Sequence, residues 1–422
     1  MNKMNNVLVI GSGGREHALC WRLKQSPSVA QIYCAPGNGG ISQDVTCLTL
    51  ATTEAIIEFC REKAISLVVI GPEQPLVEGL ADKLTSASIA CFGPSKMAAR
   101  LEGSKGFTKG LCKKYGIPTA DYGFFTSPDA AKNFLKNKTY PLVIKADGLA
   151  AGKGVIVANS QSEALEAIDS MFSGAFGDSG KSIIIEEFLE GPEVSFFALT
   201  DGTSAIEFGY AQDHKRAFDG DKGPNTGGMG TYAPPPIMTD ALRKTVMQGI
   251  ILPTVEAMKK EGCPFKGVLF AGLMLTKQGP KLLEYNARFG DPETQVLMAR
   301  FNADLYPALL ACANGGLDKV KISFSNEAAV CVVMASKGYP GTYEKGSVIK
   351  NLEKAGGAPA VKIFHAGTEK RGSDIVAVGG RVLGVTATGK TIREARDVAY
   401  KAVSAIDWPE GFCRSDIANK GL

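Results

Sequence analysis

The sequence reads Glu284-Tyr285-Asn286-Ala287-Arg288-Phe289-Gly290-Asp291-Pro292-Glu293 where two apolar runs, residues 268–276 and 281–285, come to an end. The runs predict a β-hairpin, because only a short turn separates them. Side chains two apart on a strand share a face, so Glu284 and Asn286 are expected to point the same way. Two such oxygen ligands suit a hard divalent cation that bridges phosphate groups.

Arg288 follows Asn286 at the same two-residue period. A charged strand face exposed to solvent would explain Glu284 and Arg288 equally well. It would not explain why Gly290-Asp291-Pro292-Glu293 follows at once. We therefore favour a site that handles metal and phosphate, in which Arg288 neutralises negative charge.

The chain has 422 residues, more than one hydrophobic core usually supports, and should form two to four domains. Its hydrophobic fraction of 45% and charged fraction of 21% are ordinary for a globular protein and exclude the disordered and fibrous classes. Glycine is unusually frequent, with 49 residues, and its clusters indicate places where the backbone approaches a ligand closely.

Charge and cysteine usage exclude several classes of partner. The formal net charge is +4, the 47 basic residues are spread along the chain, and no run of like charges marks a nucleic-acid-binding tail. The 10 cysteines form no Cys-x-x-Cys pair, so neither a zinc site nor a disulfide framework is indicated. The first apolar run, 7–10, is too short for a signal peptide, and no stretch has membrane-spanning length. We expect a cytoplasmic protein without nucleic-acid or membrane partners.

Residues 5–93 alternate short β-branched runs with helical patterns, the rhythm of a parallel, doubly wound sheet. The predicted strands are 7–10, 32–35, 67–70 and 89–92, and the predicted helices are 16–24, 54–63 and 76–87. A helix over 104–115 then precedes a small lobe, in which strands 142–145 and 183–187 flank a helix over 162–172. The remaining predicted elements are strands 194–199 and 205–210, a helix over 239–260, strands 329–335 and 375–385, and a helix over 392–405.

A glycine-rich turn, Gly11-Ser12-Gly13-Gly14-Arg15, joins the first strand to the first helix and can present backbone N–H groups to an anion. NAD binding is disfavoured, because the third glycine of the dinucleotide fingerprint falls at Glu16 and no ribose-binding acid follows the second strand. Arg15 suits a monophosphate better, since a guanidinium pairs with phosphate oxygens. A purely structural turn is the alternative.

A second glycine motif, Gly384-Val385-Thr386-Ala387-Thr388-Gly389-Lys390-Thr391, matches the P-loop pattern. We reject a nucleotide site there, because only 31 residues follow Thr391 in the chain of 422, whereas a P-loop needs parallel strands downstream. A chance match, or capping of the last helix by Thr391, is the better interpretation.

Strand 142–145 runs into a third glycine-rich element, Ala146-Asp147-Gly148-Leu149-Ala150-Ala151-Gly152-Lys153-Gly154-Val155, which has the composition of a flexible flap over phosphates. Lys145 at the strand end and Lys153 in the loop would place two cations near a triphosphate. Lys105, from the preceding helix, is the candidate for a third.

The strand that begins at Ile183 leaves the lobe through acids, in the order Ile183-Ile184-Ile185-Glu186-Glu187-Phe188-Leu189-Glu190-Gly191-Pro192-Glu193. Its backbone is placed to read the edge of an adenine ring. Glu193 is placed to take the ribose hydroxyls.

The segment Arg288-Phe289-Gly290-Asp291-Pro292-Glu293-Thr294-Gln295 resembles the signature of the phosphoribosylamine–glycine ligase family, also called glycinamide ribonucleotide synthetases. Further blocks resemble the same family in the same order along essentially the whole chain. These blocks are Gly11 to His17, Gly71 to Leu76, Lys145 to Gly154, and Gln212 to Arg216 through Gly223 to Gly230.

The resemblance implies an ATP-grasp fold, an α/β architecture with an N-terminal doubly wound parallel-sheet domain and a C-terminal mixed α/β domain. Residues 1–103 would form the N-terminal domain, which binds the substrate phosphate. The ATP-grasp region would span 104–325, with a mobile lobe at about 120–190 and a central domain at about 191–325. Residues 326–422 would form the C-terminal domain.

The resemblance also implies roles for individual residues. Glu284 and Asn286 would bind Mg²⁺ or Mn²⁺; the nucleoside of ATP would meet Glu186, Glu187, Leu189 and Glu193, and its phosphates Lys105, Lys145 and Lys153. The expected substrate-binding residues are Gly11, Gly13, Gly14, Arg15, Glu16, Glu73, Lys215, Gly227, Gly228, Arg288 and Gly290. Many ATP-grasp proteins carry another metal-binding acid on the preceding strand, whereas residues 268–275 contain none. Asp291 and Glu293 are the candidates to replace it.

The implied reaction joins glycine to 5-phosphoribosylamine with cleavage of ATP, through a glycyl phosphate, in de novo purine (IMP) biosynthesis. Arg288, the lysines and the backbone amides of Gly227 to Gly230 would neutralise the transferred phosphoryl group. Asp213 and Asp291 are unranked candidates to accept the amine proton. We expect a monofunctional monomer. The alternatives are another ATP-grasp carboxylate–amine ligase of nucleotide metabolism, a nicotinamide oxidoreductase and a non-catalytic nucleotide-binding module.

Overall fold

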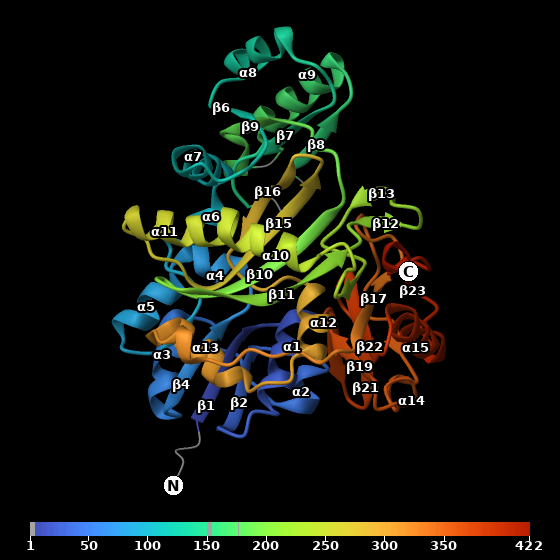
Figure 1. Ribbon diagram of the computed structural model, residues 1–422. Helices are drawn as coiled ribbons and strands as arrows, with labels where there is room; N and C mark the ends of the chain where they lie inside the picture. The colour runs from blue at the N-terminus through green and yellow to red at the C-terminus, as the bar shows by residue number, and fades with distance from the viewer. Residues whose placement is uncertain (1–4, 150–153, 176) are drawn as a thin grey trace.

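The N-terminal region forms a parallel sheet in the computed structural model, which describes residues 5–149, 154–175 and 177–422 (Figure 1). The strand order is β3-β2-β1-β4-β5, and every neighbouring pair is parallel, as predicted. The strands are β1 (Asn5–Gly11), β2 (Val29–Pro36), β3 (Thr46–Cys47), β4 (Ile65–Ile70) and β5 (Cys91–Phe92). The helices are α1 (Gly14–Leu23), α2 (Ile41–Asp44), α3 (Thr53–Glu62), α4 (Glu73–Glu78) and α5 (Leu80–Ser86).

The prediction of one helix over 76–87 is wrong. Gly79 adopts φ +92°, a left-handed conformation that ends α4 and starts α5 in a new direction. Glycine alone takes that conformation without a steric penalty, so the break is encoded at this one position.

A separate small lobe follows, at the top of Figure 1. Helices α6 (Arg100–Gly103) and α7 (Lys105–Tyr115) lead into it, and α7 has the predicted limits because Ser104 caps its start and Gly116, at φ +68°, ends it. The lobe is an antiparallel sheet in the order β6-β9-β7-β8 with its own hydrophobic core. Its elements are β6 (Tyr122–Phe125), α8 (Pro128–Phe134), β7 (Leu142–Ala146), β8 (Val155–Ala158), α9 (Gln161–Ser170) and β9 (Ile183–Glu187).

A long antiparallel sheet forms the centre of the protein, in the order β16-β15-β10-β11-β14-β17-β22-β19, with β23 beside β17. The strands are β10 (Glu193–Asp201), β11 (Ala205–Asp213), β14 (Gly230–Ala233), β15 (Lys266–Thr276), β16 (Gly279–Asn286), β17 (Ala328–Ser336), β19 (Val361–His365), β22 (Arg381–Gly389) and β23 (Gly411–Phe412). Because β14 pairs with β11 on one side and β17 on the other, sheet hydrogen bonds join the predicted central and C-terminal domains. The predicted domain limits stay predictions.

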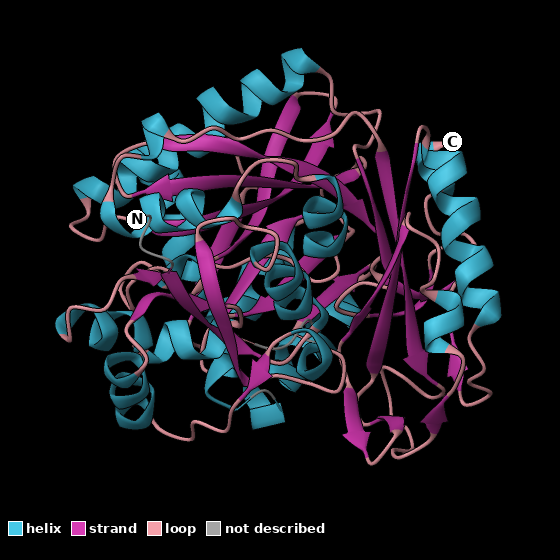
Figure 2. Cartoon of the chain, turned by 90° about the horizontal axis from the view of Figure 1, so that it is seen from below, coloured by secondary structure: helices cyan, strands magenta, loops and turns pink. Residues whose placement is uncertain are grey.

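Helices cover this sheet, and two small β-structures extend from it. Figure 2 shows the last helix, α15, lying along the C-terminal strands, where it packs on β17 and β22. The small structures are the hairpin of β12 (Arg216–Phe218) and β13 (Lys222–Asn225), and the sheet of β18 (Val348–Ile349), β20 (Thr368–Arg371) and β21 (Asp374–Ala377). The helices are α10 (Asp240–Val246), α11 (Leu252–Lys260), α12 (Glu293–Arg300), α13 (Leu305–Asn314), α14 (Leu352–Ala355) and α15 (Ile392–Ala405).

Two further predictions need correction. The strand predicted over 375–385 is two strands, β21 and β22, because the chain turns at Gly379, whose Cα lies against the backbone of Gly367 too closely for a side chain. The helix predicted over 239–260 contains a π-helical turn at residues 247–251, next to Pro253, which lacks an N–H to continue the α-helical pattern. The interpretation of Thr391 is confirmed, since its side chain accepts the N–H of Glu394 and caps α15.

Buried histidines join the N-terminal sheet to the C-terminal strands. His17 of α1 accepts the backbone N–H of His365 of β19 at Nδ1, 2.8 Å away, and its Nε2 lies 3.0 Å from Asp44. Lys362 also reaches Asp44, at 2.9 Å. Burial lowers the pKa of both histidines, that of His365 to about 3, which favours the neutral form of each imidazole. No helix in the described part of the chain has the length and apolar character needed to cross a membrane.

Candidate active site

Glu284 and Asn286 share one face of β16. This strand pairs with β15 at the edge of the central sheet, where Gly272 lies opposite Glu284. The intervening Tyr285 is buried in the core, and its hydroxyl meets that of Thr254 at 2.5 Å. Glu284 and Asn286 are only half-buried. The two predicted oxygen ligands therefore lie together on the accessible side of the strand.

Cationic side chains surround Glu284. Burial alone would raise the pKa of this carboxyl, but the positive charges of Lys215, Lys145 and Lys105 hold it below its ordinary value. Within residues 5–149, 154–175 and 177–422, no group of three or more His, Cys, Asp and Glu side chains could hold a metal by itself. A cation at Glu284 and Asn286 would thus need further oxygen ligands from phosphate and water, which is how Mg²⁺ is commonly held.

Glu186 pairs with two lysines from different elements. Lys145 Nζ lies 3.0 Å from Glu186 Oε2 and Lys109 Nζ lies 3.1 Å from Glu186 Oε1, with all three residues buried. Lys109 is absent from the predicted site, although it follows Lys105 by four residues on α7 and so lies on the same side of the helix. Lys105 Nζ donates to Gly148 O at 2.9 Å and ties α7 to the start of the glycine-rich flap. Burial lowers the pKa of Lys105 and of Lys109.

A small pocket lies beside this charged face. Its lining includes Glu193, Ser195, Asp213, Lys215 and Gly272. Lys215 Nζ lies 2.7 Å from Glu193 Oε2, so the acid predicted to meet a ribose and a lysine predicted to meet substrate are brought together. The pocket thus joins residues of β10, β11 and β15 that are far apart in the sequence.

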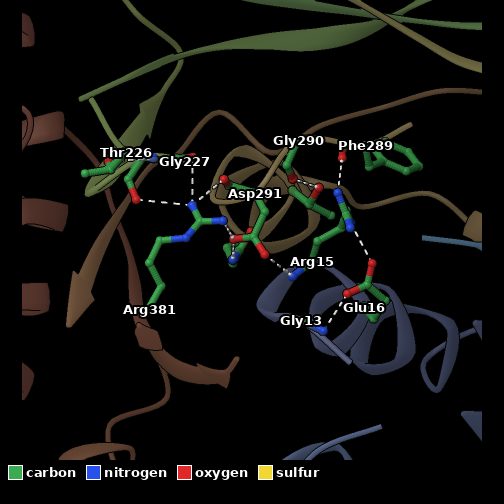
Figure 3. A network of polar contacts seen from close by, with 12 residues as sticks. Gly13, Arg15, Glu16, Thr226, Gly227, Phe289, Gly290, Asp291 and Arg381 are labelled. Atoms are coloured by element: carbon green, nitrogen blue, oxygen red, sulfur yellow. Dashed lines mark hydrogen bonds and ion pairs between the residues drawn. The ribbon is translucent and has the colours of Figure 1, made fainter. Parts of the chain in front are cut away.

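A second group of predicted residues meets around Asp291 (Figure 3). Asp291 Oδ2 accepts the backbone N–H of Arg15 at 3.2 Å, and Asp291 O accepts a hydrogen bond of 2.7 Å from Arg381 Nη1. The same nitrogen of Arg381 donates to Gly227 O at 2.7 Å and to Gly228 O at 3.2 Å. Arg381, which sequence reasoning missed, therefore links the C-terminal strands to two loops of the predicted site.

Arg15 and Glu16 make contacts within the protein. Arg15 Nε donates to Glu16 Oε1 at 2.6 Å, and Arg15 Nη1 donates to Phe289 O at 3.0 Å (Figure 3). Gly13 N donates to Glu16 Oε2 at 2.6 Å. The N–H groups of Gly13 and Arg15, which the turn was expected to offer to an anion, are thus bound to carboxylates. Contact between this turn and a substrate phosphate stays a prediction.

Arg288 is held between two acids. Its Nε lies 3.3 Å from Glu73 Oε2 and its Nη2 lies 3.1 Å from Glu102 Oε1, so α4 and α6 fix the guanidinium from two sides. Glu102 also accepts the backbone N–H of Ala287 at 2.7 Å. Arg288 is therefore held from two sides just beyond the strand that carries Glu284 and Asn286, and its role towards substrate stays a prediction.

The remaining predicted residues are less central. Glu187 Oε1 accepts hydrogen bonds from Lys281 Nζ at 2.9 Å and from the backbone N–H of Asp121 at 3.0 Å, so this oxygen is engaged within the protein. Leu189 is buried in a small apolar cluster. Lys153 lies outside the described residues.

Comparison with known proteins identifies the family. Models of the phosphoribosylglycinamide synthetase family match the chain in three parts, the N domain over residues 5–102, the ATP-grasp (A) domain over 103–294 and the C domain over 329–420. The chain belongs to this family. The phosphoribosylamine–glycine ligase of Mesorhizobium japonicum is 56% identical and covers 98% of this chain and 97% of its own. The chloroplastic enzyme of that name from Arabidopsis thaliana is 58% identical, over 97% of this chain and 79% of its own.

Solved structures confirm the expected ATP-grasp fold. The phosphoribosylamine–glycine ligase of Thermotoga maritima has a TM-score of 0.86 and 34% identity, and covers 97% of this chain and 99% of that one. The biotin carboxylase domain of the Hydrogenobacter thermophilus 2-oxoglutarate carboxylase has a TM-score of 0.74 at 17% identity, covering 98% and 92% of the two chains, and shares the fold alone. The first sheet thus belongs to the N domain of this ligase family, and not to a nicotinamide oxidoreductase.

The side chain of Glu16 packs closely against Gly71. A Cβ added at Gly71 would overlap the Glu16 carboxylate, whereas one added at Gly110, on the exposed side of α7, has no atom within 4 Å. Gly71→Ala should therefore destabilise the protein by about 1–3 kcal/mol. Gly110→Ala should be neutral or stabilise it by up to about 1 kcal/mol, because alanine favours a helix. Urea unfolding of the two variants measures the difference. Equal midpoints would show that Glu16 does not need the space that Gly71 leaves.

Proposed function

We propose that the chain catalyses the ATP-dependent ligation of glycine to 5-phospho-D-ribosylamine in de novo purine biosynthesis, giving glycinamide ribonucleotide, ADP and phosphate. The observation that carries this proposal is the position of Glu284, held ionised among three lysines beside a pocket of polar groups. The family relatives supply the identity of the substrates, since those named above are phosphoribosylamine–glycine ligases that match nearly the whole chain. The same geometry alone would fit another ATP-grasp carboxylate–amine ligase.

The residues present fit a divalent cation and a triphosphate. Glu284 and Asn286 supply oxygen donors of the kind that Mg²⁺ and Mn²⁺ accept, and they would hold the cation. When bound, that cation would draw negative charge away from the phosphate oxygens. Lys105 and Lys145 approach the same face from α7 and β7, and are placed to receive the phosphates.

The chemistry proposed for this site has two steps. An oxygen of the glycine carboxylate attacks the γ-phosphorus of ATP, the bond to the bridging oxygen breaks, and ADP leaves. The amine nitrogen then attacks the carbonyl carbon of glycyl phosphate, phosphate leaves, and the nitrogen loses a proton. The side chains act by orientation and by charge, because no protein nucleophile is required.

Asp213 is the better candidate to accept the amine proton. Burial, together with the negative charges of Glu293 and Glu193, raises its pKa to about 8 even though Lys215 and Arg381 oppose the shift. Asp213 also lines the pocket beside Glu284. A base of that pKa is well matched to an amine near neutral pH.

Asp291 is a weaker candidate for this role. Burial would raise its pKa, but Arg381 and Arg15 hold it below its ordinary value. Its carboxylate already accepts hydrogen bonds from Arg15 N and from Gln295 Nε2, at 2.9 Å in the second case. We therefore assign Asp291 to the contacts that join Arg15 and Arg381, and Asp213 to proton transfer.

Omission of each substrate tests the proposed function. With ATP and Mg²⁺ present, ADP should form rapidly only when glycine and phosphoribosylamine are both supplied, and one glycinamide ribonucleotide should form for each ADP. The measurement is a coupled ADP assay with product detection by mass spectrometry. Full activity with one of the two substrates missing, or no activity with both present, would overturn the assignment.

A change at Asp213 tests proton transfer. The wild-type rate should rise with pH up to about 8, because the Asp213 carboxyl loses its proton over that range. Asp213→Asn should lower the rate at least about a hundredfold and remove this rise. Asp169→Asn, at an exposed surface pair with Lys132, is the matched control and should behave as wild type. A pH–rate profile that is unchanged in Asp213→Asn would assign the proton to another group.

A further inference from the structure

The β12–β13 hairpin has little apolar support beyond the ring of Phe218, whose centroid lies 6.1 Å from that of Phe412. It projects next to the C-terminus in Figure 1, and Ala217 is the one buried residue in its two strands. Phe218 is 50% exposed. Because apolar burial cannot fix a segment of this kind, polar contacts must hold it if it is to keep one position.

Arg414, from the tail that follows α15, supplies the largest set of those contacts, while Ser415 also donates to Asp219 and Lys420 also pairs with Asp221. Its side chain is buried, at 1% exposure, against the hairpin. Its Nη1 donates to Arg216 O at 2.9 Å and lies 3.0 Å from Asp221 Oδ1. Its Nε and Nη2 bind the two carboxylate oxygens of Asp416 at 2.7 and 2.8 Å, and Asp416 Oδ2 accepts the N–H of Gly220 at 2.8 Å. The planar guanidinium fork thus bridges the base and the tip of the hairpin.

The tail itself is fixed to α15. Tyr400 Oη donates to Arg414 O at 2.7 Å and accepts the N–H of Ile417 at 3.0 Å. Arg396 Nη2 donates to Ser415 O at 2.9 Å. Since α15 packs on β17 and β22, the hairpin is connected to the central sheet through this tail.

The two ends of the hairpin lead directly into the candidate active site. On one side the chain continues from Arg216 to Lys215, whose backbone oxygen accepts the N–H and the hydroxyl of Thr226 at 2.7 and 2.9 Å. On the other side Thr226 Oγ1 accepts the N–H of Gly228 at 3.0 Å. A displacement of the hairpin would therefore move Lys215 and the glycine loop together.

We propose that Arg414 is a positioning residue of the ligase, which places Lys215 and the Gly227–Gly228 loop by fixing the hairpin from the C-terminal tail. The expected effect on catalysis rests on the proposed function. The expected effect on the position of the hairpin rests on the contacts alone. Loss of Arg414 leaves Asp221 and Asp416 able to reach water, since both are partly exposed. The effect is thus a local loosening and not unfolding.

The test compares Arg414→Met with Arg371→Met, which removes an exposed arginine of β20 that pairs with Glu369. Trypsin should cut Arg414→Met within residues 215–222 at least about tenfold faster than wild type, because a loosened hairpin presents the backbone next to its two lysines and its arginine to the protease. Arg371→Met should resist trypsin as wild type does. Amide formation should fall about tenfold in Arg414→Met, since misplaced groups stabilise the transition state less well.

The ratio of ADP to amide separates positioning from loss of folded protein. In Arg414→Met, water should compete with the amine for the carbonyl carbon of glycyl phosphate, releasing glycine and phosphate, so that ADP exceeds amide about twofold or more. A smaller folded fraction would lower both products equally. Asp416→Asn, which removes one partner of Arg414, should show smaller changes in the same direction and replaces Arg414→Met if that variant fails to fold.

The proposal would be overturned if Arg414→Met resisted trypsin as wild type does and formed ADP and amide in a ratio of one. The same result in Asp416→Asn would overturn it where that variant replaces Arg414→Met. A wild-type enzyme that makes no ADP with all substrates present would overturn the proposed function instead, and the trypsin result would still decide whether Arg414 fixes the hairpin.

Discussion

The carboxylate of Glu284 has to remain ionised at a half-buried strand end, and the arrangement of the candidate site follows from that requirement. A carboxyl removed from water tends to take up a proton, which would spoil it as a metal ligand. Lys105, Lys145 and Lys215 prevent this, and each comes from a different part of the chain. The fold has to bring α7, the lobe strand β7 and the end of β11 to one face of β16, and the tight hairpin of β15 and β16 gives them a fixed target.

Each of those lysines is itself held in place. Lys145 pairs with Glu186, Lys215 pairs with Glu193, and Lys105 donates to a backbone oxygen of the flap. Such pairing fixes where the cations lie before a triphosphate arrives, so that little reorganisation is needed when it binds. Support also comes from outside the ATP-grasp region, because the C-terminal strands and tail contact the loop that follows Lys215.

Local patterns were enough to predict the strand that carries the two proposed metal ligands. Glu284 and Asn286 alternate with an apolar residue on a strand, and that period is visible in a few consecutive residues. The break at Gly79 could not be predicted from the helical pattern, because a glycine inside such a pattern can either be tolerated or end the helix. Arg381 and Arg414 could not be found locally, since they bind backbone oxygens 90 to 198 residues away. No spacing in the sequence encodes such contacts, and only the fold shows them.

A comparison of Glu284→Gln with Glu58→Gln, a change at an exposed acid of α3 outside the site, measures the central claim most directly. Both variants should fold, with melting temperatures within a few degrees of wild type. Glu284→Gln should lower ATP turnover at least about a hundredfold, because the amide lacks the charge that holds the cation. It should also bind Mn²⁺ more weakly in the presence of nucleotide, as measured by electron paramagnetic resonance. Glu58→Gln should keep both. A Glu284→Gln enzyme with wild-type turnover and Mn²⁺ affinity would contradict the account.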